Sequence, residues 1–132
     1  MAIDIILKKA SEAKKISKHF RARELMCPCC RECIVDAELL KILEEIRYII
    51  GEPIHVTSGY RCEKHNTEVR GAKNSQHLYG KAADIWAEDT STEELYNIAC
   101  NQMPGYGGVI KYKTFVHIDT RDKKYREDKS ND

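Results

Sequence analysis

Two histidines and one aspartate supply the residue types of a catalytic zinc site. His77 and Asp84 belong to the run from Ser75 to Ile85, and His117 lies further along in the run from Phe115 to Asp119. A zinc ion bound by three side chains of these types keeps one coordination position for water, which is typical of catalytic and not of structural zinc. The three residues therefore predict a metal site that could activate water.

Two short strands are expected to position these side chains on stiff backbone. The segment Ala82–Trp86 has small and apolar residues around Asp84, which is typical of a buried strand. Side chains of the segment Phe115–Asp119 alternate between two faces if it is also a strand, so His117 and Asp119 point the same way. This alternation predicts that a ligand and a second carboxylate lie together.

Each candidate ligand also has a purely structural interpretation. A histidine among apolar residues is often a hydrogen-bonded core residue, and Asp84 could simply end a strand. Short motifs match by chance, so any one of these residues alone predicts little. Gly80 and the alanines at 82 and 83 indicate that backbone passes close to another segment near His77. The combination favours the metal site.

Three blocks of this sequence form a recognisable pattern: Thr57-Ser58-Gly59-Tyr60-Arg61 with His65-Asn66, Ser75-x-His77 to Asp84-Ile85, and Phe115-Val116-His117-Ile118-Asp119. In this order and spacing they resemble the M15-type zinc peptidases, the D-Ala-D-Ala carboxypeptidases and peptidoglycan endopeptidases of bacteria and phage lysis cassettes. The resemblance extends over roughly residues 36–121 and implies an M15 or hedgehog-like fold. It implies that His77, Asp84 and His117 bind Zn²⁺ and that Arg61 faces the substrate.

Three further residues are candidates for contact with a substrate. Beside a metal, the guanidinium of Arg61 would stabilise charge on a substrate carbonyl oxygen or bind a carboxylate, although it could also be a surface arginine. The Ser75 hydroxyl could contact the same substrate group, although serine in a polar loop is more often a turn former. Tyr112 is one of several aromatic residues that would line the cleft or pack in the core.

The general base has more than one interpretation. Several members of the resembled family carry an acid three residues before the last histidine ligand, where this chain has Thr114, which cannot take a proton. Asp119 could replace that acid, since it shares a strand face with His117. Equally, Asp119 could orient a metal-bound histidine through its other ring nitrogen. A chain that kept the metal and lost turnover is the third interpretation.

Length and charge favour a small single-domain enzyme. The chain has 132 residues, which predicts one domain over residues 1–121 and a charged, frayed tail over 122–132. With 22 basic and 21 acidic residues, it lacks the basic excess of a nucleic-acid-binding module. No apolar run approaches the ~18 residues of a membrane span. The first residues lack a signal-peptide pattern, which fits a protein made in the cytoplasm and released to the cell wall by phage-type lysis as well as a mature fragment of a longer precursor. The sequence does not separate these two origins, and we expect a monomer.

The remaining pattern predicts an α+β fold with a small antiparallel sheet that carries the zinc site and packs against three to four helices. Helices are expected over residues 3–18, 36–50 and 91–100, where Ser91 and Glu94 form a capping box. Strands are expected over residues 54–57, 82–86, 109–110 and 115–119.

Six cysteines could form a second structural feature. Cys27, Cys29, Cys30 and Cys33 are clustered, and Cys62 and Cys100 lie elsewhere. A second metal would need a pair from the cluster together with Cys62 or also His65, whereas an oxidising compartment would favour disulfides and a reducing one free thiols. We assign no catalytic role to any cysteine.

The leading hypothesis is a zinc metallopeptidase, endolysin-like, that hydrolyses peptide bonds in peptidoglycan stem peptides. The motifs do not distinguish carboxypeptidase from endopeptidase cleavage. The alternative is a catalytically inactive, zinc-containing module for cell-wall binding or phage assembly, which Thr114 supports. A third hypothesis is a thiol-based metal or redox protein built around the cysteines.

Overall fold

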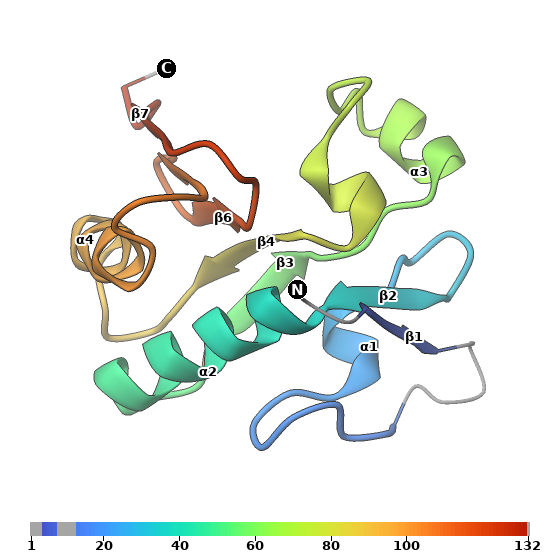
Figure 1. The fold of residues 1–132 in the computed structure, drawn as a ribbon, viewed down its shortest axis with the longest axis horizontal. Helices are drawn as coiled ribbons and strands as arrows, with labels where there is room; N and C mark the ends of the chain where they lie inside the picture. Colours follow the sequence, from blue (N-terminus) through green and yellow to red (C-terminus); the bar gives the residue numbers. More distant parts are fainter. Residues whose placement is uncertain (1–3, 8–12, 132) are drawn as a thin grey trace.

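The computed structural model describes residues 4–7 and 13–131, which form an α+β fold (Figure 1). The described helices are α1 (Ala22–Leu25), α2 (Ala37–Ile50), α3 (Glu63–Glu68), α4 (Thr92–Gln102) and the short 3₁₀ helix η2 (Gln76–Tyr79). The strands are β1 (Asp4–Leu7), β2 (Cys33–Asp36), β3 (His55–Ser58), β4 (Ala82–Trp86), β5 (Gly108–Lys111), β6 (Val116–Asp119) and β7 (Tyr125–Asp128).

Five of these strands form the main sheet, in the order β3-β4-β6-β5-β7, and β1 and β2 form a separate antiparallel pair. The first three pairings of the main sheet are antiparallel, as expected, but β7 lies parallel to β5. The sheet is therefore mixed. The expected α+β class is confirmed, and the strands predicted near residues 54, 82, 109 and 115 are all present.

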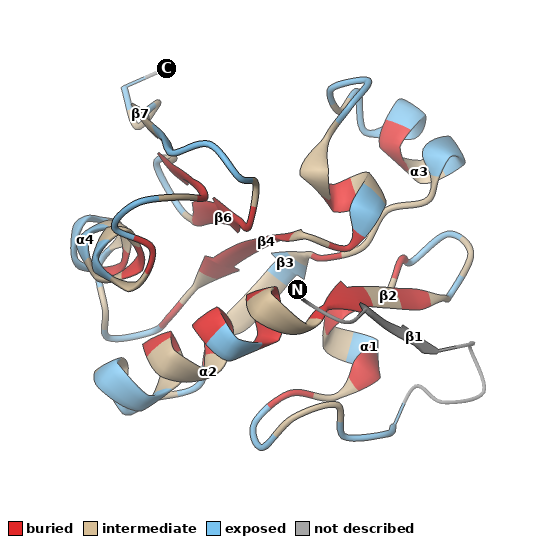
Figure 2. Ribbon diagram, viewed as in Figure 1, coloured by how far each residue is buried: buried red, intermediate tan, exposed pale blue. Residues whose placement is uncertain are grey.

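Opposite faces of the main sheet have different environments, because side chains alternate along each strand. Ala83, Ile85 and Ile118 pack into one apolar core with residues of α2 and α4. Asp84 and His117 occupy the other face and are also buried. Figure 2 shows this burial as continuous red over much of β4 and β6. The sheet thus separates a hydrophobic layer from a polar site.

Helix α2 provides much of the apolar layer. Its buried residues lie at helical spacing, as the sequence predicts. Gly51 ends the helix in a left-handed conformation (φ 69°) and donates its N–H to the Arg47 carbonyl. The buried residues of α2 are Leu39, Leu40, Ile42, Leu43 and Ile46.

Helix α4 begins with the predicted capping box. The Ser91 hydroxyl accepts the Glu94 N–H at 3.1 Å, and the Glu94 carboxylate accepts the Ser91 N–H at 3.4 Å. Buried Leu95 and Ala99 face the core. Among the described residues, no helix combines the length and apolar character needed to cross a membrane.

The helix expected over residues 3–18 is wrong where the structure describes it. Asp4–Leu7 is strand β1, paired with Cys33–Asp36, and residues from Ala13 to Lys18 form turns and an isolated bridge. Residues 8–12 lie outside the described residues. Pairing with β2 outweighs a weak amphipathic pattern in this segment.

The charged segment after Arg121 contains a strand where a frayed tail is expected. Tyr125–Asp128 forms β7 beside β5. The backbone N–H groups of Tyr125 and Lys129 donate to the carbonyls of Gly107 and Lys111 at 2.9 and 2.7 Å. These backbone bonds attach the segment to the sheet, and the Arg126 guanidinium adds hydrogen bonds to the Gly107, Met103 and Tyr106 carbonyls.

Candidate metal centre

Asp84 and His117 face each other on neighbouring strands. They are direct partners in the antiparallel register of β4 and β6. His77 enters from η2, which precedes β4 in the chain. All three side chains are buried, and their potential ligand atoms lie within 4.8 Å of one another. The structure thus brings together the three predicted metal ligands, two from a rigid ladder and one from a helical turn.

Both imidazoles approach the same carboxylate oxygen. His117 Nδ1 lies 2.9 Å and His77 Nε2 lies 3.3 Å from Asp84 Oδ1. A tetrahedral ion bound at about 2.0–2.1 Å needs donor atoms about 3.3 Å apart, so this spacing suits a small cation. The ring planes of His77 and His117 are inclined at 66°, which directs the two nitrogens to a common point from different sides.

The remaining nitrogen of each histidine already has a hydrogen-bond acceptor. His77 Nδ1 lies 2.7 Å from the Gly59 carbonyl oxygen, and His117 Nε2 lies 2.8 Å from Asp119 Oδ2. Because these contacts require N–H groups on those nitrogens, the lone pairs of neutral imidazoles fall on the nitrogens that face Asp84. Three acceptors that converge in this way need a proton or a cation between them.

Electrostatics favours positive charge at this point. Burial alone would raise the pKa of Asp84, but hydrogen bonds with His117 and His77 hold that pKa well below its ordinary range. Burial alone would lower the pKa of His117, yet its hydrogen bonds to Asp119 and Asp84 raise it. The carboxylates therefore stabilise a cation here, as a protonated imidazole or as a metal ion.

Asp119 lies behind His117 and away from solvent, with an exposed fraction of 0%. Its Oδ1 accepts the Gly108 N–H at 3.0 Å and the Arg121 Nε–H at 2.8 Å, and its Oδ2 accepts from Arg121 Nη2 at 2.7 Å as well as from His117. Burial would raise the pKa of Asp119, whereas the bonds from His117 and Arg121 hold it below its ordinary range. This carboxylate is thus fully engaged as an acceptor, which suits the interpretation that it orients His117.

His77 is fixed by its own local structure. The Ser75 hydroxyl accepts the His77 backbone N–H at 3.2 Å and caps η2. Gly80 ends η2 with φ 69°, and a Cβ at this position would lie 2.2 Å from the Ile34 carbonyl oxygen. The close backbone approach that the sequence indicates at Gly80 is therefore present, and it is made with strand β2.

Arg61 is held at the edge of the three-residue cluster. Its Nε donates to the Ser58 hydroxyl at 3.0 Å and its Nη1 to the Asn66 side-chain oxygen at 3.1 Å. Its Nη2 lies 3.6 Å from Asp84 Oδ2, and its backbone N–H donates to the His77 carbonyl. The guanidinium is thus oriented before any ligand arrives.

A cleft of about 580 Å³ opens over His77, Asp84 and His117. Asp84 is the one acidic residue among the described residues that line it. Four arginine or lysine side chains also line the cleft, together with Ser75 and with Tyr112, which stacks on Phe115 at a centroid distance of 4.5 Å. The four cationic residues are Arg61, Arg70, Arg121 and Lys129.

Thr114 does not face this cleft. It is exposed in the turn between β5 and β6, beside Lys113 and Trp86 in a different surface depression. The position three residues before His117 therefore contributes nothing to the polar site in this chain.

Sequence reasoning missed three groups that hold the site. The Gly59 carbonyl comes from a loop and accepts from His77, 18 residues away, and the Asn66 amide comes from a short helix and accepts from Arg61, five residues away. Arg121 lies two residues beyond Asp119, so the same alternation that placed Asp119 beside His117 could have indicated it. No comparable pattern identifies a backbone carbonyl.

Two comparisons with known proteins agree with this geometry. A sequence profile described as peptidase M15 matches residues 3–119. A zinc D-Ala-D-Ala carboxypeptidase of Streptomyces albus G is 38% identical over 73 residues, which cover 50% of this chain and 29% of that protein. The chain thus matches under a third of the length of this relative.

Proposed function

Because the chain belongs to the M15 peptidase family, we propose that it is a zinc-dependent peptidase that hydrolyses peptide bonds in peptidoglycan stem peptides. The observation that carries the proposal is the convergence of His77, Asp84 and His117 on one point beneath a cationic cleft. The donor set of two imidazoles and one carboxylate suits Zn²⁺. When bound, the ion supplies Lewis acidity and lowers the pKa of water for attack on a carbonyl.

His77 and His117 would bind the metal through Nε2 and Nδ1 respectively, the nitrogens that face Asp84. Gly59 and Asp119 would hold the opposite nitrogens as N–H donors. Such contacts fix the tautomer and ring orientation of a ligand histidine. We therefore propose Asp119 as a positioning residue for His117, in preference to a general base.

Arg61 would stabilise negative charge that develops on the substrate. Its bonds to Ser58 and Asn66 leave Nη2 directed toward Asp84 and the cleft. A donor held in advance does not have to reorganise during the reaction, and this makes it effective for transition-state stabilisation. The same group could bind a terminal carboxylate.

The charge of the cleft supports an anionic peptide as substrate. Arg70, Arg121 and Lys129 lie along the walls in addition to Arg61, and the acidic residue Asp84 is engaged with the histidines. Stem peptides carry several carboxylates, so they fit such a surface, and a cationic cleft raises the local concentration of anions. The Ser75 hydroxyl caps η2 and lines the cleft, where Tyr112 would form an aromatic wall.

One observation favours a second candidate function. The cleft holds no carboxylate besides Asp84 among the described residues, and Thr114 points elsewhere. A site without a proton acceptor suits a zinc-containing module that binds cell-wall peptides without cleaving them. The two candidates differ in turnover and share the metal.

The test measures zinc content and peptide cleavage on the same sample. Purified protein is incubated with a D-Ala-terminated stem peptide and with intact peptidoglycan, with and without a chelator. Zinc-dependent release of fragments is expected. His117→Ala should lose both the metal and cleavage, whereas His55→Ala, which removes a half-exposed histidine stacked on Trp86, should keep both. Peptide binding without cleavage would support the second candidate, and a metal-free wild type would contradict both.

A further inference from the structure

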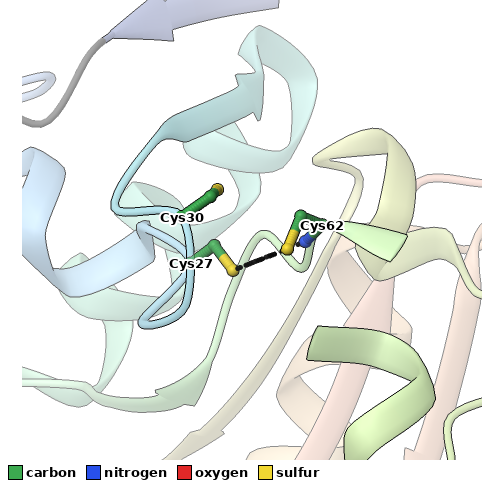
Figure 3. Close-up of side chains that lie close together, drawn as sticks. All are labelled: Cys27, Cys30 and Cys62. Atoms are coloured by element: carbon green, nitrogen blue, oxygen red, sulfur yellow. Dashed lines mark hydrogen bonds between the residues drawn. The ribbon is translucent and has the colours of Figure 1, made fainter. Parts of the chain in front are cut away.

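Three cysteines converge in a second cluster, separate from His77, Asp84 and His117. Cys27 and Cys30 lie in the loop between α1 and β2, and Cys62 immediately precedes α3 (Figure 3). Their sulfur atoms lie within 4.8 Å of one another. Cys29, exposed in the same loop, lies close enough to Cys62 to interact with its thiol. Three of the six cysteines therefore meet at one point, with Cys29 exposed in the same loop, and the buried Cys33 packs separately in the apolar core.

The loop is folded so that its thiols project together. The Cys27 carbonyl accepts the Arg31 N–H at 2.8 Å, and the Cys27 N–H donates to the Glu32 carbonyl at 2.8 Å. Arg31 has a left-handed conformation (φ 59°), which reverses the chain directly after Cys30. A Cys-x-x-Cys pair on such a turn presents two sulfurs to one side, the spacing found in structural zinc sites.

The third sulfur is brought in by backbone contacts between distant segments. The Cys62 N–H donates to Cys27 Sγ at 3.4 Å. Two residues earlier, the Tyr60 N–H donates to the Leu25 carbonyl at 2.8 Å, and a Cβ on Gly59 would lie 2.6 Å from that carbonyl oxygen. The segments therefore meet because their backbones pair, independently of any bond between sulfurs.

The sulfur spacing suits a metal better than a disulfide. Cys27 Sγ and Cys62 Sγ are 3.6 Å apart. Tetrahedral zinc with Zn–S bonds of about 2.3 Å places its sulfurs about 3.8 Å apart. A disulfide needs about 2.05 Å and would leave the thiol of Cys30, which lies at the same point, and that of the neighbouring Cys29 without a role.

We propose that Cys27, Cys30 and Cys62, with Cys29 as the fourth ligand, bind a structural Zn²⁺ ion. The donors are soft thiolates, which select zinc over the hard cations. Each thiol gives up its proton to solvent when it binds. This site is separate from the His77–Asp84–His117 centre and does not depend on the proposed peptidase activity.

The position of this second ion gives it a structural consequence. Cys62 follows Arg61 directly, and the Gly59 carbonyl holds His77. A metal that ties Cys62 to the loop at Cys27 and Cys30 would fix this segment at both ends, since β3 ends at Ser58. The thiolate site thus braces the residues that orient Arg61 and His77.

The experiment separates the two metals in the 132-residue chain. Zinc is measured after purification under reducing conditions and removal of loosely bound ions. We expect about two zinc ions per chain in the wild type and about one in the double variant His77→Ala/His117→Ala, whose cysteines are intact. Cys62→Ser and Cys30→Ser should each lose about one ion, and Cys100→Ser, a cysteine on α4, should lose none.

Cobalt supplies the identifying signal for sulfur ligands. The double histidine variant loaded with Co²⁺ should show an intense near-ultraviolet sulfur-to-cobalt band, and Cys30→Ser introduced into that variant should weaken it. A double histidine variant that binds neither zinc nor cobalt would overturn the proposal, as would a Cys27–Cys62 disulfide found by alkylation before and after reduction. Absence of peptide cleavage would contradict the peptidase assignment and leave this measurement unaffected.

Discussion

The substitution Asp119→Asn separates the two roles considered for Asp119. An amide keeps the shape of the carboxylate but offers one acceptor oxygen in place of two. If that oxygen continues to accept from Gly108 and Arg121, as Oδ1 does now at 2.8–3.0 Å, the NH₂ group faces His117 Nε2. His117 must then move its proton to Nδ1, the nitrogen that we assign to the metal.

Two magnitudes follow from this geometry. Loss of a group that orients a ligand histidine weakens metal binding about 10–100-fold, equivalent to about 1.4–2.7 kcal/mol. The charge-assisted bonds from His117 and Arg121 to Oδ2 are also lost. With a discount for Arg121, whose side chain is 31% exposed, we expect the free energy of unfolding to fall by about 2–4 kcal/mol.

The assay is a zinc titration against a chromophoric chelator, followed by turnover of a D-Ala-terminated stem peptide at saturating zinc. A positioning role predicts weaker zinc binding and a kcat within about tenfold of the wild type once zinc is saturating. The exposed substitution Asp89→Asn is the matched control and should change neither quantity. Unchanged zinc affinity with kcat reduced by about 10²–10⁴ would refute the reasoning and restore Asp119 as the base.

Three other substitutions test separate parts of the structure. Arg61→Lys keeps the charge but loses the fixed fork, so kcat/KM should fall about 10²-fold with zinc content unchanged, and an equal loss of zinc would contradict the assigned role. Gly80→Ala places a side chain on left-handed backbone and its Cβ clashes with β2, so the free energy of unfolding in urea should fall by about 2–4 kcal/mol. Gly51→Ala has the same φ but open space around the Cβ, so it should lower the free energy of unfolding by only about 1 kcal/mol. Burial would raise the pKa of Glu44, but hydrogen bonds from Ser17 and His19 lower it, so its stabilisation is present above its ordinary pKa and lost as the pH falls below it. Glu44→Gln should therefore reduce stability by about 0.5–1 kcal/mol near pH 7, and the difference should shrink as the pH falls through the lowered pKa of Glu44. A pH-independent difference would contradict this linkage.

The ligand strands were predictable because their signal is local. Alternation within Ala82–Trp86 and Phe115–Asp119 decides which side chains share a face, and it correctly places Asp119 beside His117. The direct pairing of Asp84 with His117 follows once these strands are neighbours. Apolar periodicity likewise predicts α2, since its buried stripe is long.

The sequence predictions fail at two segments where pairing of the backbone decides the structure. Asp4–Leu7 is too short for its pattern to distinguish a helix from a strand, and β2 supplies its partner. Tyr125–Asp128 has no apolar alternation, yet it joins the sheet through backbone bonds to the β5 segment. A single sequence contains no signal that identifies such backbone partners.

The pairing of β4 with β6 also acts as a check on correct assembly. Sliding β6 by one residue would turn His117 into the layer packed against α2 and α4 and bring Val116 or Ile118 to the polar face. Such a slipped chain would bury an imidazole among apolar side chains and present no complete ligand set. Only the native alignment can bind the ion at full affinity, so the metal would selectively stabilise correctly aligned molecules over misaligned ones.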